Sequence, residues 1–413
     1  MNVAGSTSAG NLGQPESRSL NGSGDACDGV IHFGNVDWWY HNRGHASTRM
    51  ATRLARQVPT VWMNSIAMRA PRLGHTELAW QRYIRKARSL IKGLRRDPET
   101  GMWIYSTLFI PRYTARCLDW NGHLLAAQVR WVCRRLKIQR PSALVSIPTV
   151  VPAIEQLDWV NVVFDRCDDF TTMPGINVEL IRSMENRLLD RCDYAVYVNT
   201  PLYERERNRV NAHFIGHGVD FEAFAQARPV GGPTGVPPKP LGDLPRPIVG
   251  FYGGLDEYRM DLELMIKVAK HVPHGSVLII GPKQMDLSPL EVLPNVTFLG
   301  QLLPSELPEY AAQFDVGMIP FLRNEFNLHC NPTKLNEYLA LAFPIVATRL
   351  PAFESHEDLM YLAETHEEFL KLIDRALEET DQTLPQRRRD AVAGQSWDVV
   401  TGLVAQRLGV PMA

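Results

Sequence analysis

Hydrophobic residues along this chain form short apolar runs that alternate with longer amphipathic stretches. In the first half, the apolar runs predict strands at 30–34, 60–64, 102–109, 143–148, 161–165 and 194–199. The stretches between them repeat apolar residues every three or four positions, which predicts helices at 44–57, 77–95, 120–137 and 177–191. Strands that alternate with helices in this way indicate a parallel sheet with helices on both faces.

The same alternation begins again after a segment that cannot form a regular element. Residues 228–246 are dense in proline and glycine, which predicts a linker. Beyond it, strands are expected at 247–254, 276–281, 296–300, 314–321 and 344–348, and helices at 260–272, 332–341 and 366–379. A last helix, 394–408, stands outside the alternation. The predicted fold is α/β, with two doubly wound, Rossmann-like domains facing a cleft.

The length of 413 residues also favours two domains. We expect an N-terminal domain at 29–227 and a C-terminal domain at 247–385. Residues 386–413 are expected to form a C-terminal helix that packs back on the N-terminal domain. Residues 1–28 are rich in glycine, serine and asparagine, and we expect them to be a disordered extension.

Charge is divided unevenly between the two predicted domains. Residues 29–225 hold 27 Lys and Arg against 18 Asp and Glu, a net charge of +9. Residues 247–385 hold 9 against 21, a net charge of −12. This asymmetry indicates that the two domains bind different partners.

Cysteine usage and hydropathy bear on the compartment. The six cysteines contain no C-x-x-C pair, which argues against a zinc module or a disulfide framework and fits a reducing cytoplasm. No apolar run approaches the roughly 18 to 20 residues of a membrane span. We therefore expect a cytoplasmic protein, with peripheral contact to the inner face of the membrane as a further hypothesis.

That hypothesis rests on residues 69–96, which hold nine Lys and Arg and one acid with apolar residues interleaved. A basic helix of this kind can lie on an anionic bilayer. The alternative is a solvated basic helix. No nucleic-acid partner is expected, because no recognised nucleic-acid module accompanies the charge.

The helix predicted at 332–341 carries candidate binding groups in its first turn. Asn331 is expected to cap it through its side chain, and Pro332 suits the first helical position. Lys334 and Glu337 lie three residues apart and share a face near the electropositive helix start. A cation and a carboxylate placed there can hold a diphosphate and a sugar hydroxyl. The alternative is an ordinary surface helix.

A second candidate group follows the first strand of the C-terminal domain. Gly253 and Gly254 end that strand, and glycine lets backbone amides approach a phosphate closely. Arg259 comes five residues later, and its guanidinium can bind a phosphate through two hydrogen bonds. The alternative is a tight turn followed by a solvated arginine.

In their order and spacing, four segments resemble the nucleotide-sugar domain of GT-B glycosyltransferases of the group 1, family-4-like type. The segments are VGFYGGLDEYRMDLELMIKVAK, VLIIGP, VTFLGQLLPSELPEYAAQFDVGMIPF and NPTKLNEYLALAFPIVAT. Residues 194–224 resemble the segment that closes the N-terminal domain of these enzymes. The match is good over about 194–400 and weak over the first 190 residues.

The resemblance implies roles for individual residues. Glu337 matches the carboxylate that binds the nucleotide ribose. Gly253, Gly254, Arg259 and Lys334 match the region around the donor diphosphate, with Asn331 beside it. Lys283 falls near the nucleobase, although a surface lysine is the alternative there. His329 and Ala342 depart from the family pattern, which usually has a glutamate and a helix-ending glycine at these two positions.

Two groups in the N-terminal domain are candidates for the reaction and the acceptor. Asp168 and Asp169 follow a strand, where related enzymes carry a His-Asp or Asp-Asp pair, and they can act as a general base or stabilise positive charge. A capped turn is the alternative. Asp37, His41 and Arg43 follow the first strand among aromatic residues and suit an acceptor sugar.

The resulting functional hypothesis is a glycosyltransferase that takes its sugar from a nucleoside diphosphate sugar and gives it to a saccharide or lipid-linked acceptor. The resemblance implies retention of anomeric configuration and a role in cell-surface polysaccharide or glycolipid synthesis. No metal and no cofactor beyond the donor are expected. The alternatives are a nucleotide-sugar epimerase of the same fold and a non-catalytic relative that binds a sugar nucleotide or a polysaccharide.

Overall fold

The computed structural model describes residues 26–39, 44–64, 84, 87–233 and 237–411. Within these residues, eight strands form an N-terminal sheet in the order β3-β4-β2-β1-β5-β6-β7-β8, parallel throughout except for the antiparallel β3–β4 pair. They are β1 (Gly29–Phe33), β2 (Thr60–Met63), β3 (Leu94–Arg96), β4 (Trp103–Tyr105), β5 (Pro141–Val145), β6 (Val162–Arg166), β7 (Tyr194–Tyr197) and β8 (Ala212–Phe214).

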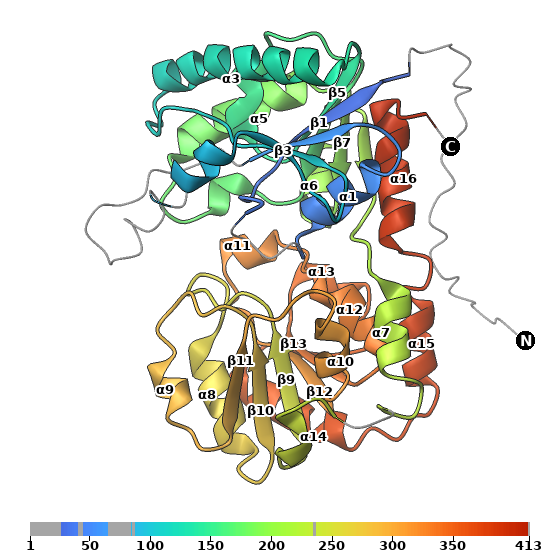
Figure 1. The fold of residues 1–413 in the computed structure, drawn as a ribbon. Coiled ribbons are helices and arrows are strands. Elements are labelled where there is room, and N and C mark those ends of the chain that lie inside the picture. Colours follow the sequence, from blue (N-terminus) through green and yellow to red (C-terminus); the bar gives the residue numbers. More distant parts are fainter. Residues whose placement is uncertain (1–25, 40–43, 65–83, 85–86, 234–236, 412–413) are drawn as a thin grey trace, which may run out of the picture.

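A second sheet forms the centre of the C-terminal domain. In the described part of the chain it has six parallel strands in the order β11-β10-β9-β12-β13-β14. They are β9 (Ile248–Tyr252), β10 (Ser276–Ile280), β11 (Val296–Gly300), β12 (Val316–Ile319), β13 (Ile345–Thr348) and β14 (Tyr361–Ala363). The predicted α/β fold with two parallel-sheet domains is therefore confirmed, and Figure 1 shows the two domains one above the other.

Helices pack against both sheets. Those of the first half are α1 (Ala46–Leu54), α3 (Ala115–Leu136), α4 (Val151–Ile154), α5 (Val178–Arg191), α6 (Thr200–Glu206) and α7 (Phe221–Ala227). Those of the second half are α8 (Leu262–His271), α9 (Ser288–Glu291), α10 (Leu307–Ala311), α11 (Glu325–Leu328), α12 (Lys334–Leu341), α13 (Pro351–Glu354), α14 (His366–Leu377), α15 (Leu384–Asp390) and α16 (Trp397–Leu408).

Side-chain alternation along the strands divides the N-terminal core into two layers. On β1, Ile31 and Phe33 belong to the core cluster that α3 and α5 cover. Val30, on the opposite face, belongs to a cluster that includes Val400 and Val404 of α16. Since successive strand residues point to opposite faces, each buried strand supplies apolar residues to both layers. The C-terminal helix α16 therefore completes one face of the N-terminal sheet (Figure 1).

Three strands escaped the sequence interpretation, namely β3, β8 and β14. Each has only three residues and lies at the edge of its sheet. Edge strands pair on one side only and need no long apolar run, so hydropathy does not reveal them. β3 also corrects the helix predicted at 77–95, because residues 87–92 are helical and a strand follows at 94–96.

The chain passes from the N-terminal to the C-terminal domain earlier than we predicted, and it returns to the N-terminal domain later than we predicted. Helix α7 was assigned to the N-terminal domain, but Phe224 is buried in the C-terminal core cluster. Val392, just after α15, belongs to the same cluster, so only α16 of the C-terminal segment packs on the N-terminal sheet. The two crossings meet where Val219 N donates to Gln395 O at 2.8 Å. The boundary at 227 is thus corrected to a crossing near 215–220.

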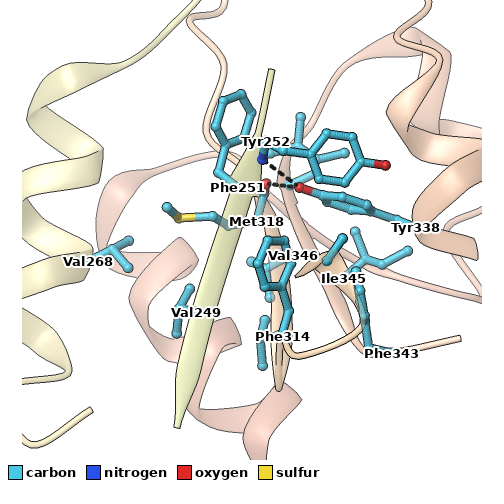
Figure 2. Close-up of a cluster of buried hydrophobic side chains, with 14 of the residues drawn as sticks. Val249, Phe251, Tyr252, Val268, Phe314, Met318, Tyr338, Phe343, Ile345 and Val346 are labelled. Atoms are coloured by element: carbon cyan, nitrogen blue, oxygen red, sulfur yellow. Dashed lines mark hydrogen bonds between the residues drawn. The ribbon is translucent and has the colours of Figure 1, made fainter. Parts of the chain in front are cut away.

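An aromatic cluster fixes α12 against the C-terminal sheet. The Tyr338 ring packs edge-on against Tyr252 and Phe343, with centroid distances of 5.1 Å to each. Its hydroxyl accepts a hydrogen bond from Tyr252 N at 3.4 Å and donates one to Met318 O at 3.5 Å. Figure 2 marks both with dashed lines. The sheet has Gly317 at this point, since a Cβ there would lie 2.3 Å from the Phe343 ring. These contacts place the first turn of α12 beside the end of β9.

Ala342 ends α12 in the left-handed conformation, with φ of 64°. A residue with Cβ in this conformation carries strain of about 1–3 kcal/mol. We expect Ala342→Gly to raise the free energy of unfolding by about 1 kcal/mol, since the relief exceeds the loss of one methyl group. Urea denaturation followed by circular dichroism measures the change. Ala340→Gly, inside the same helix, is the control and should destabilise by about 1 kcal/mol; equal effects of both variants would refute the strain.

Candidate active site

Gly253, directly after β9, lies at the centre of the candidate site. Its φ is 145°, a conformation that residues with Cβ rarely adopt, and its N–H donates to Ile280 O at 2.8 Å. A Cβ at this position would lie 3.2 Å from Lys334 Nζ. Glycine therefore lets the lysine side chain approach the strand end.

Lys334 is almost completely buried at this point, with 8% of its surface exposed. Its ammonium lies 5.0 Å from the ring centre of Phe321 and 5.3 Å from that of Phe251. Among the described residues, no carboxylate lies within ion-pair distance of it. Burial, together with the charge of Arg259, lowers the pKa of Lys334 to about 8.

Arg259 is the second cation of the site. Its guanidinium carbon lies 5.2 Å from the ring centre of Phe326, and its Nε is buried without a hydrogen-bond partner in the described structure. The loop is held in place because Asn327 Nδ2 donates to Arg259 O at 3.0 Å. A buried donor without a partner costs about 1–3 kcal/mol. Arg259 and Lys334, two cations without a carboxylate partner in the described structure, form a site that an anion would complete.

Glu337 lies on the same face of α12 as Lys334, one turn further on. The Tyr252 hydroxyl donates to Glu337 Oε2 at 2.6 Å. Burial raises the pKa of Glu337, while the Tyr252 hydrogen bond and the charge of Arg49 lower it in part. Its other carboxylate oxygen, Oε1, accepts no hydrogen bond in the described structure and can accept one from a ligand hydroxyl.

Asn331 does not cap α12, which corrects our prediction. The helix begins at Lys334, and its N-cap is Thr333, without a side-chain hydrogen bond. The Asn331 side chain instead crosses to the N-terminal domain, where Nδ2 donates to Val198 O at 2.6 Å. Its carbonyl accepts from His217 Nε2 at 2.9 Å. Asn331 therefore joins the two domains, a contact that sequence spacing does not reveal.

The remaining donor-side candidates lie around this centre. Gly254 is partly exposed beside Gly253. His329 ends α11, where its Nδ1 lies 2.9 Å from Glu325 O. Lys283 forms an ion pair with Glu291, so its charge is already neutralised. Lys334 is thus the centre of the donor-side candidates: it lies beside Gly253, and the charges of Arg259 and Glu337 both act on it.

The two neighbouring aspartates of the N-terminal domain differ in their surroundings. Asp169 accepts hydrogen bonds from Thr171 N at 3.1 Å and from Arg205 Nη1 at 2.9 Å. Burial opposes its ionisation, but these donors and the charge of Arg166 hold its pKa below the usual range. For Asp168, burial raises the pKa, and the largest opposing influence is the charge of Arg259 across the domain boundary. The charge of Arg259 thus acts on Asp168, whereas Asp169 caps the following turn.

Behind these aspartates lies a buried ionic network that the sequence did not reveal. Arg166, with 1% of its side chain exposed, contacts Glu185 at 2.5 Å and Glu206 at 3.3 Å. The Tyr197 hydroxyl donates to Glu206 at 3.0 Å. Arg166 Nη1 also donates to Asp168 O at 2.8 Å, which fixes the backbone of that residue.

The acceptor-side candidates are only partly covered. Asp37 accepts a hydrogen bond from Trp39 N at 3.0 Å, just after β1. His41 and Arg43 lie outside the described residues, as do residues 69–83 and 85–86 of the basic segment. Within the part of the chain that the structure covers, no helix has the length and hydropathy needed to span a membrane.

Sequence reasoning missed three residues that contact or influence the site. Tyr252 holds Glu337, and only its position directly before the two glycines hinted at a role. Arg49 of α1 reaches Asp220 at 2.5 Å and places a positive charge near Glu337. Cys330 is buried among the charged groups, and its burial raises the thiol pKa to about 11, so it is uncharged.

The pKa of Lys334 predicts a pH dependence of anion binding. A lysine with a pKa near 8 is charged below that pH and loses its charge as the pH rises above it. A terminal phosphate is already ionised above about pH 7. We therefore expect the affinity for a nucleoside diphosphate to fall about tenfold between pH 7 and pH 9. Calorimetric titrations measure the decline, and Lys334→Met should abolish it; an unchanged pH profile in that variant would show that another group titrates.

Comparisons with known proteins show which sequences and folds this chain resembles. Residues 246–379 match the family model described as "Glycosyl transferases group 1". The putative teichuronic acid biosynthesis glycosyltransferase TuaH of Bacillus subtilis is 25% identical over 281 residues, which are 61% of this chain and 68% of that protein. Sucrose-phosphate synthase from Thermosynechococcus elongatus superimposes with a TM-score of 0.64 at 14% identity, over 92% of this chain and 98% of that one. Anabaena HepE in complex with UDP and glucose superimposes with a TM-score of 0.62 at 11% identity, over 93% of this chain and 100% of that one.

Proposed function

We propose that this chain is a group 1 glycosyltransferase with the GT-B fold, which moves a sugar from a nucleoside diphosphate sugar to a saccharide or glycolipid acceptor. The observation that carries this proposal is the meeting of Arg259 and Lys334 beside Gly253, without a carboxylate partner among the described residues. A diphosphate has the negative charges that would neutralise both. One structural neighbour, HepE, was solved with UDP-glucose, which supports a donor of this class.

Each donor-side residue then has a distinct task. Arg259 and Lys334 stabilise the negative charge that develops on the departing diphosphate. Glu337 accepts a hydrogen bond from a ribose hydroxyl through Oε1, while Tyr252 holds Oε2. Because these side chains supply the positive charge, the proposed reaction needs no metal ion.

Asp168 is the proposed catalytic group on the acceptor side. It lies past the end of β6, and the charge of Arg259 acts on it across the domain boundary. We assign it to the reacting sugar, where a carboxylate can accept the acceptor proton or stabilise positive charge on the ring. We expect retention of anomeric configuration, as the group 1 resemblance implies. Asp169 supports Asp168 by shaping the turn that follows it.

The acceptor is proposed to be a cell-surface polysaccharide or its lipid-linked precursor. The similarity to a putative teichuronic acid glycosyltransferase supports this choice. The net charge of +9 over residues 29–225 suits an anionic acceptor on the N-terminal domain. Such an enzyme would work at the inner face of the cytoplasmic membrane.

A donor-turnover assay tests the proposal. Purified protein is incubated with a panel of nucleoside diphosphate sugars, with and without acceptor extract, and released nucleoside diphosphate is measured. We expect Glu337→Ala to raise KM for the productive donor about 10- to 100-fold, because a charged hydrogen bond is lost. Glu325→Ala, exposed on α11, is the control. Conversion of the donor sugar without release of nucleoside diphosphate would identify an epimerase instead.

A further inference from the structure

The outer face of α3 carries aromatic and basic side chains in one row. Exposed residues recur there at intervals of three or four, which places them on a single helix face. They are Arg116, Trp120, His123, Ala127, Trp131 and Arg134. Trp120 is 72% exposed and Trp131 is 49% exposed, unusual values for tryptophan. Figure 1 shows α3 on the outside of the N-terminal domain, with the sheet on its inner side.

An extended segment beside α3 adds aliphatic side chains to this face. Leu108 and Ile110 are 53% and 51% exposed. Gln128 of α3 bonds both backbone groups of Leu108, at 2.8 and 2.9 Å. Asn121 of α3 does the same for Ile110, at 2.8 and 2.9 Å. The two amide side chains replace a β-ladder, so the segment is fixed and its apolar side chains are held outward.

The charge on this face is positive and lacks internal partners. Arg116 and Arg134 form no ion pair with any carboxylate that the structure describes. The acidic residue on α3, Asp119, is engaged with Arg187 at 3.6 Å. A depression lined by Arg116, Trp120 and His123, together with Asp119, opens between the exposed side chains.

This face also begins at the edge of the sheet that borders the candidate active site. Residues 106–113 leave the carboxyl end of β4, and Asp168 follows the carboxyl end of β6 in the same sheet. Strands β4 and β6 both run parallel to β1 through the sheet, so their carboxyl ends lie at one edge. The segment that contributes Leu108 and Ile110 to this face therefore starts at the same sheet edge as Asp168, where the acceptor would react.

We propose that Leu108, Ile110, Arg116, Trp120, Trp131 and Arg134, the α3 surface, dock on an anionic lipid bilayer. Tryptophan is favoured at the boundary between hydrocarbon and headgroups, and arginine is attracted to anionic headgroups. Fixed aliphatic side chains can enter the acyl boundary. A nucleic acid would use the arginines but would leave Leu108 and Ile110 without an apolar environment. This inference does not depend on sugar transfer.

Vesicle co-sedimentation of the full chain tests the proposal. Wild type should bind vesicles of phosphatidylcholine with phosphatidylglycerol more tightly than vesicles of phosphatidylcholine alone, and less tightly at high salt. Trp120→Ser with Trp131→Ser should lower binding about tenfold or more. The charge reversals Arg116→Glu and Arg134→Glu should each lower vesicle binding about fivefold or more. Val292→Ser with Val399→Ser removes exposed apolar residues elsewhere and should leave binding unchanged.

Several results would overturn the proposal. One is a failure of wild-type protein to bind anionic vesicles. If the same protein still turns over donor, this inference fails while the proposed function stands. Another is binding that survives the α3-surface changes but is lost in Arg82→Glu with Arg85→Glu, which would place the contact in the basic segment. A dimer in light scattering that Trp120→Ser dissociates would assign the face to a second copy. A circular dichroism spectrum and a urea denaturation midpoint unchanged from wild type show that each variant is folded.

Discussion

Replacing Arg259 or Lys334 with methionine is expected to lower kcat/KM for donor turnover by about 10²–10³ in each case. Lys334 is buried and Arg259 is half-buried; each lies against an aromatic ring, and neither has a carboxylate partner in the described structure. Their charge is therefore available for the diphosphate and is only weakly screened by solvent. Negative charge grows on the leaving group as the glycosidic bond breaks, so kcat should fall as well as kcat/KM.

Methionine keeps the size and apolar contacts of the lysine stem, which limits structural damage. Lys371→Met, on the exposed face of α14, is the matched control and should leave turnover unchanged. Steady-state rates of nucleoside diphosphate release provide the measurement. A loss confined to KM, with kcat intact, would mean that the two cations bind donor and transition state equally and do not assist the departure.

Replacing Glu206 with alanine is expected to lower the free energy of unfolding of the N-terminal domain by about 3–5 kcal/mol. The change removes one partner of Arg166, which is 1% exposed and cannot regain its charge compensation from water. It also leaves the Tyr197 hydroxyl without its acceptor and frees Arg205 from one of its two partners. Glu185 remains as a carboxylate partner of Arg166, so the buried charge is only partly compensated in this variant, and that is the main source of the loss.

Urea denaturation followed by fluorescence measures this change, with separate transitions fitted for the two domains. Glu206→Gln keeps a hydrogen-bond acceptor at the same position and should cost less than the alanine variant. An exposed pair provides the control: Glu204→Ala removes an ion pair with Arg207 and should change stability by less than 1 kcal/mol. Equal losses in the Glu204 and Glu206 variants would contradict a structural role for the network.

Hydropathy alone was sufficient to predict the long, buried elements of both sheets. Strands such as β1 and β10 are apolar on both faces because helices cover both sides, and such runs are easily recognised. The Lys334–Glu337 spacing likewise predicted a shared helix face, since i and i+3 positions coincide on any helix. In the structure both residues lie at the end of β9, beside Gly253 and Tyr252.

The parts that could not be predicted depend on contacts between distant residues. The side chain of Asn331 was predicted to cap a helix, but its amide donates a hydrogen bond to Val198 O, 133 positions away in the sequence. The carboxylate of Asp169 resembled a catalytic group, but Thr171 and Arg205 occupy it. Local spacing fixes neither choice, because each is decided by which backbone and side-chain groups the fold brings near.

Left-handed Ala342 is an intermediate case. The sequence showed that a residue with Cβ stands where related chains have glycine, but two outcomes were open, a different turn or a strained one. The φ of 64° shows that the left-handed turn is kept. The Arg388 guanidinium lies 3.5 Å from its carbonyl oxygen, so a buried residue from α15 supports the strained turn.

The most direct test of the donor site is calorimetric titration with UDP, GDP and ADP. We expect one of these nucleoside diphosphates to bind wild type with a Kd between about 1 μM and 1 mM, the usual range for enzyme substrates. The Arg259→Met, Lys334→Met double variant should show no measurable binding of that ligand, while Lys371→Met binds it as wild type does. Wild-type affinity in the double variant, or no binding of any of the three by wild type, would contradict the assignment of these residues to the donor diphosphate.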